Sequence, residues 1–75
     1  MTTSVIYRWR KITDINRDHP LFELLHVDVP VLDVGFTDEG SFEVAFNPSI
    51  VGRVLEFRQF VKLLDEGRSL AELDR

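Results

Sequence analysis

The sequence predicts an α+β fold: a small antiparallel sheet of three strands, or four, with a C-terminal helix packed on one face and a short helix before a central hairpin. Three patterns lead to this prediction. Apolar and polar residues alternate on both sides of a short loop that contains Asp and Gly, an early segment alternates in the same way, and a late segment has helical spacing. With 75 residues, the chain is expected to form a single domain, 1–75.

The first strand is expected in residues 4–12, where apolar and basic side chains alternate. Arg8 and Arg10 lie on one face of this strand. The other face, which we expect to join the core, carries Val5, Tyr7 and Trp9, the β-branched and aromatic types that favour strands.

A short helix is expected next, because Asp18 can cap a helix and Pro20 fits its first turn. The apolar residues that follow have helical spacing: Leu21, Phe22, Leu24 and Leu25. A helix of about two turns is marginal by itself, so tertiary packing would have to hold it.

The central hairpin is expected around the loop 37–41. In the simplest register Phe36 lies opposite Phe42, and the strands then share one apolar face. That face consists of Leu32, Val34, Phe36, Phe42, Val44 and Phe46.

Residues 49–55 allow two interpretations. Asn47 can cap a helix with Pro48 at its first position, or residues 51–55 can form a short strand beside the hairpin. Both interpretations remain open at this stage.

The C-terminal helix is expected over residues 56–66, where apolar side chains recur every three or four positions. Gly67 is expected to end it. The segment 69–72 matches a capping box, which predicts a further helical turn.

Composition excludes several classes of function. Without Cys the chain has no disulfide, thiolate metal site or cysteine nucleophile, and its apolar runs are too short to span a membrane. The net charge of −4 disfavours direct binding to nucleic acid. No catalytic motif is found, so we expect a protein that is not an enzyme, uses no cofactor and is located in the cytoplasm.

The acidic residues are segregated, since residues 18–52 contain seven carboxylates and no Lys or Arg. If the first strand joins the hairpin sheet, Arg8 and Arg10 would share a face with Asp33 and Glu43 and pair with them. The carboxylates beyond the reach of these pairs would form an acidic rim that binds a basic protein. This partner-binding rim consists of Glu23, Asp28, Asp38 and Glu39.

The sequence therefore predicts a non-enzymatic protein-interaction module. Size and charge alone suggest an inhibitor or antidote of a basic protein. The alternative is a homo-oligomeric structural or accessory subunit, in which a strand edge or apolar residues such as Val51, Leu55 and Leu63 meet a second copy. No metal site is predicted; the best candidate ligands for a divalent cation are His19, Glu23 and His26, at helical spacing.

Overall fold

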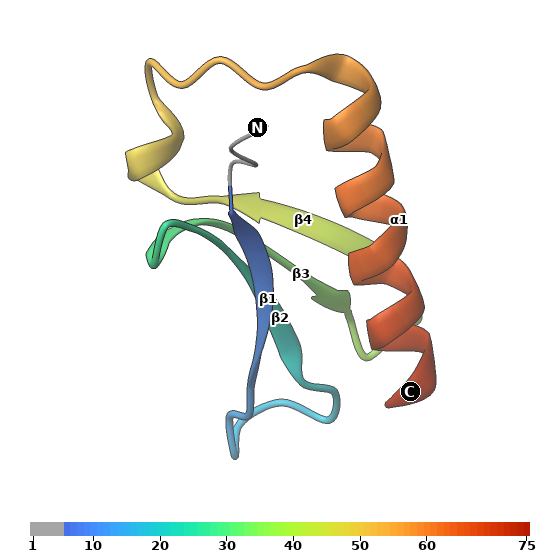
Figure 1. Ribbon diagram of the computed structural model, residues 1–75. Helices are drawn as coiled ribbons and strands as arrows, with labels where there is room; N and C mark the ends of the chain where they lie inside the picture. The colour runs from blue at the N-terminus through green and yellow to red at the C-terminus, as the bar shows by residue number, and fades with distance from the viewer. Residues whose placement is uncertain (1–5) are drawn as a thin grey trace.

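A four-stranded antiparallel sheet and one long helix make up the protein, which confirms the α+β prediction (Figure 1). The computed structural model describes residues 6–75, so Ser4 and Val5 of the predicted first strand lie outside the described residues. The strands are β1 (Tyr7–Ile12), β2 (Leu21–His26), β3 (Val29–Phe36) and β4 (Phe42–Phe46). They follow one another across the sheet in chain order, so β1 and β4 are its two edges.

Strand β2 corrects the prediction of a short helix before the hairpin. Residues 21–26 are extended and pair with β1 on one side and with β3 on the other. Leu24 and Leu25 are both buried although they project from opposite faces of β2, whose register with β1 is regular. A strand buried on both faces lacks the alternation of apolar and polar residues, so its leucines resemble helical spacing, which explains the wrong prediction. Within residues 6–75, the one short helical turn follows the hairpin, at η1 (Pro48–Ile50).

The β3–β4 hairpin has the predicted register. Phe36 lies opposite Phe42, Val34 opposite Val44, and Leu32 opposite Phe46. The loop is closed by a hydrogen bond of 2.8 Å from the backbone N–H of Thr37 to the carbonyl oxygen of Ser41. Gly40 has a φ of 89°, a conformation that glycine adopts without steric cost.

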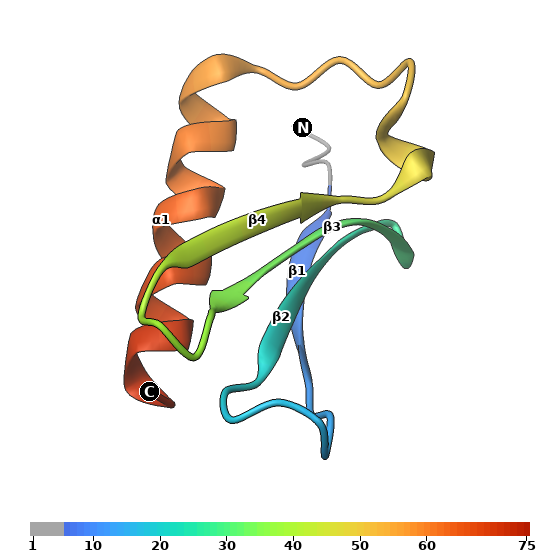
Figure 2. The same ribbon diagram turned by 180° about the vertical axis from the view of Figure 1, so that it is seen from behind.

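Residues 47–56 adopt neither of the two predicted forms. Asn47 does act as a cap, since its side chain accepts a hydrogen bond of 3.0 Å from the backbone N–H of Ser49. The helical turn ends after three residues, however, and residues 51–56 continue without regular structure. We call residues 51–56 the arch, because they cross over one end of the sheet to reach the helix (Figures 1 and 2).

The helix α1 (Phe57–Leu73) is longer than predicted. Glu56 caps it, accepting hydrogen bonds from the backbone N–H groups of Arg58 (3.1 Å) and Gln59 (2.8 Å). The prediction that Gly67 ends the helix is wrong. Gly67 is buried in the middle of α1, where an added Cβ would lie 2.7 Å from the indole ring of Trp9. A close approach between helix and sheet therefore requires this glycine.

The core lies between α1 and the middle of the sheet. Its fully buried side chains come from β2 and β3, and α1 contributes Leu63 and Ala71. Trp9 packs against this core from β1, as predicted. Across residues 6–75, no helix combines the length and the apolar character that crossing a membrane requires.

Candidate functional site

Two of the four predicted rim carboxylates are used inside the fold. Asp28 accepts a hydrogen bond of 2.9 Å from Nη2 of Arg8, and Glu23 pairs with Arg10 across β1 and β2. The Glu23 side chain is only 15% exposed. The arginines of β1 thus find their acids on β2 and in the β2–β3 turn, because β1 pairs with β2 and not with the hairpin β3–β4.

The predicted pairing of Arg8 and Arg10 with Asp33 and Glu43 is therefore wrong. Asp33 lies directly opposite Glu23 in the β2–β3 ladder, on the sheet face away from α1. Partial burial, and then the charge of Glu23, raise the pKa of the Asp33 carboxyl, while Arg17 opposes the rise. Asp33 and Glu43 border a hollow of about 110 Å³ beside Gly35.

Asp38 and Glu39 occupy the tip of the β3–β4 hairpin, and we call this pair the acidic tip. Both side chains are exposed, and neither forms a salt bridge within the described part of the chain. Of the predicted rim, the acidic tip is the part that forms no ion pair within the described residues.

The candidate metal ligands do not come together. Glu23 and His26 are separated by three residues in a strand, so they project from opposite faces of the sheet, and His19 precedes the strand. No set of three metal-binding side chains is found among residues 6–75. The helical spacing that suggested this site does not apply, because residues 21–26 form a strand.

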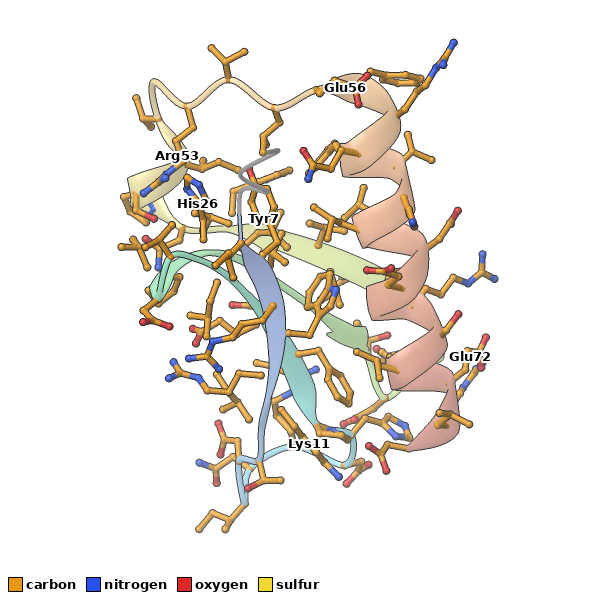
Figure 3. The ribbon with its side chains drawn as sticks, viewed as in Figure 1. Tyr7, Lys11, His26, Arg53, Glu56 and Glu72 are labelled. Carbon is orange, nitrogen blue, oxygen red and sulfur yellow. The ribbon has the colours of Figure 1, made fainter. Side chains whose placement is uncertain are left out.

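His26 instead helps to fasten the arch to the sheet. Its ring stacks on Tyr7, with centroids 4.8 Å apart, and its Nδ1 atom accepts a hydrogen bond from Arg53. Arg53 also donates from Nε to the carbonyl oxygen of Ser49, at 2.9 Å. Figure 3 shows the three labelled side chains Tyr7, His26 and Arg53 gathered at the arch end of the sheet.

The β2–β3 turn holds two residues in a conformation that L-amino acids rarely adopt. Val27 has a φ of 48° and Asp28 a φ of 66°, between the paired residues His26 and Val29. Positive φ at both central positions is the signature of a type I′ hairpin turn, which usually selects Asn and Gly. A β-branched valine there is strained.

Two open hollows lie between β1 and α1. One has a volume of about 540 Å³ and reaches from Tyr7 to Glu56, and the other, about 490 Å³, reaches from Trp9 to Leu73. The indole N–H of Trp9 is buried and has no hydrogen-bond partner in the described structure. These hollows contain apolar and mixed charged side chains without a converging set of polar groups.

The edge strand β4 exposes apolar surface that its neighbour buries. Phe46 is 61% exposed, although Leu32, directly opposite it on β3, is 1% exposed. The difference arises because α1 lies over β2 and β3 and leaves the end of β4 uncovered. In Figure 2, β4 lies in front of the helix and the other strands.

Within residues 6–75, the edge of β4 away from β3 also presents backbone groups without a partner. Asn47 donates to the carbonyl oxygen of Val31 directly opposite, and Thr37 donates to Ser41 in the same ladder. Since hydrogen-bonded and non-hydrogen-bonded pairs alternate, Glu43 and Ala45 face β3. The backbone N–H and C=O groups of Phe42, Val44 and Phe46 therefore point outward. We call these three residues and their outward groups the β4 edge.

The two edges of the sheet differ in their protection. β1 carries Arg8, Arg10 and Lys11, and charges of this kind discourage strand pairing. β4 has a single charged residue, Glu43, and contains neither Pro nor Lys. Of the residues named from the sequence for self-association, Val51 is exposed and Leu55 half-buried, while Leu63 belongs to the core.

Comparisons with protein-family models, with curated proteins and with solved structures found no match to this chain.

Proposed function

We propose that this chain is a non-enzymatic protein-interaction module that binds another polypeptide through the β4 edge. The observation that carries the proposal is the exposure of Phe46 at 61%, beside a row of buried core residues on β3. Exposed apolar surface next to unpaired strand backbone is the combination that strand-adding partners use.

The partner would add an extended segment alongside β4. Its backbone would pair with the outward groups of Phe42, Val44 and Phe46, which supplies affinity without reading side chains. Alternate side chains of the added segment would then lie over Phe46 on the helix side and over Ala45 on the opposite side. The small Ala45 leaves space there for a larger side chain.

The acidic tip adds charge selectivity at one end of this edge. Asp38 and Glu39 are exposed in the loop that leads into β4, so a basic residue on the partner fits that end. An inhibitor or antidote that binds a basic protein remains the proposed type, with two carboxylates of the rim in contact instead of four.

The proposal includes no catalytic step. Asp33 and Glu43 border a hollow of about 110 Å³, which is small beside the roughly 300–1,000 Å³ of ligand sites. The proposed cytoplasmic location follows from the lack of Cys, which fits a reducing compartment.

Affinity capture with matched variants tests the proposal. The wild-type protein, Phe46→Lys, and the double variant Asp38→Lys with Glu39→Lys are immobilised and exposed to native lysate, then eluted in steps of rising salt. Phe46→Lys should lose the captured protein, and the double variant should release it at lower salt. Arg58→Ala, on the exposed face of α1, is the control and should capture normally. Equal capture by all four proteins would reject the β4 edge as the contact.

A further inference from the structure

The β4 edge has a sequence that is complementary to itself. We propose that its occupant is a second copy of this chain, and that two β4 strands pair antiparallel about a two-fold axis through Val44. This inference rests on the proposed function for its surface, the β4 edge, and replaces the basic protein with a second copy of this acidic chain as the partner. The two sheets would then form one continuous sheet of eight strands.

Hydrogen-bond geometry permits this register. The outward backbone groups belong to Phe42, Val44 and Phe46, so an axis through Val44 aligns each of them with an outward-facing residue of the second copy. Val44 then exchanges both of its bonds with Val44 of the second copy. Phe42 pairs with Phe46 of the second copy, and the reverse pair completes the ladder.

Side-chain chemistry favours the same register over its neighbours. With the axis at Val44, Glu43 lies opposite Ala45 of the second copy, so no like charges meet. An axis at Glu43 would place two glutamates directly opposite each other, which destabilises a strand pair. An axis at Ala45 would bring Phe42 opposite Pro48, which lies in η1 and has no N–H to donate.

The apolar side chains that α1 leaves uncovered are buried by this pairing. Phe46 of each copy comes beside Phe42 of the other, on the helix side of the joined sheet. Aromatic pairs directly opposite each other are among the favourable cross-strand pairs. The exposed Phe46 thus gains the neighbour that its own chain does not provide.

The ends of β4 bring no like charges together in this register. The acidic tip precedes the strand, and the other end leads into η1, which has no charged residue. A two-fold axis through Val44 exchanges these ends, so each acidic tip approaches the uncharged η1 of the other copy. The other edge strand, β1, is less suited, because in the register centred on Trp9 each Arg8 would lie opposite Arg10 of the other copy.

Sedimentation velocity of the pure protein, from about 10 µM to about 1 mM, covers the range in which small interfaces associate. The wild type should pass from monomer to dimer. Ala45→Glu places like charges opposite Glu43 of the second copy twice, so it should weaken the dimer about fivefold to tenfold. Ala45→Lys, at the same exposed position, should strengthen it, and Glu43→Lys combined with Ala45→Glu should restore it. Circular dichroism checks that each variant is folded.

Amide hydrogen exchange identifies the edge. The amides of Glu43 and Ala45 should be protected at every concentration, and those of Phe42, Val44 and Phe46 should become protected only as the dimer forms. A wild type that stays monomeric throughout, or a dimer without this alternating protection, would overturn the inference. Loss of capture by Phe46→Lys combined with a monomeric wild type would retain the proposed function and reject only the second copy as partner.

Discussion

Replacing Gly67 with alanine tests how closely α1 approaches the sheet. An exposed glycine inside a helix is destabilising, and alanine in its place would raise stability by about 1 kcal/mol. Gly67 is not exposed, however. A Cβ atom there would lie 2.7 Å from Cζ2 and Cη2 of Trp9 and 3.1 Å from Cγ2 of Val34.

The expected magnitude follows from these distances. Carbon atoms in contact normally lie about 3.5–4.0 Å apart, so the new methyl group overlaps the indole ring by about 1 Å. Neither neighbour can move freely, because Trp9 packs against the core and Val34 is fully buried. Overpacking of this kind costs about 1–3 kcal/mol, which leaves a net destabilisation of up to about 2 kcal/mol. The free energy of unfolding of a domain of this size is only about 3–5 kcal/mol in total.

Urea unfolding measures the effect, with circular dichroism as the signal. Ser69→Ala, at an exposed position of the same helix, is the control and should be neutral or slightly stabilising. Trp9→Phe removes the two ring atoms that the new Cβ would overlap. In this background Gly67→Ala should lower the free energy of unfolding by less, or should raise it. A Gly67→Ala protein about 1 kcal/mol more stable than wild type would refute the packing of Trp9 against the helix backbone.

Three further substitutions test local features. Val27→Asn should stabilise the protein by about 1 kcal/mol, because asparagine tolerates the positive φ of the type I′ turn; an unchanged urea midpoint would contradict the strain. Asp33→Asn should stabilise it by up to about 1 kcal/mol at pH 7, with the gain vanishing near pH 3. The raised pKa of Asp33 means that its charged carboxylate is unfavourable in the folded protein. This cost to stability is present above the pKa of the folded state and absent below the pKa of the unfolded state, so its removal stabilises the protein at pH 7. A pH-independent gain would point to another cause. Glu56→Ala should cost about 1 kcal/mol by removing the helix cap, whereas Asp at that position should retain most of it; equal thermal midpoints for both would count against capping.

Local patterns were sufficient for the elements whose residues alternate or repeat without interruption. The β3–β4 register was predictable because only one pairing of Phe36 with Phe42 aligns all the apolar side chains. Strand β2 was not predictable in this way. Leu24 and Leu25 are buried on its opposite faces, and a strand buried on both faces loses the alternation that identifies it.

The candidate site depended even more on strand order. Asp38 and Glu39 could be assigned to an exposed loop from the sequence, and they are exposed. Glu23 and Asp28 could not be removed from the rim without knowing that β1 pairs with β2. The open edge of β4 could not be predicted either, because the sequence of β4 does not indicate whether another strand pairs with it.

Local sequence patterns were enough to predict the fold class, the central hairpin with its register, the inward side of Trp9 and the position of the C-terminal helix. These features depend on the periodicity of neighbouring residues, which the chain carries locally. Three features became clear from the three-dimensional arrangement: the acids that pair with Arg8 and Arg10, the reason Gly67 lies inside the helix, and the open edge of the sheet. Each of these depends on which strands lie side by side and where α1 crosses them, and contacts between distant segments leave little trace in local sequence pattern.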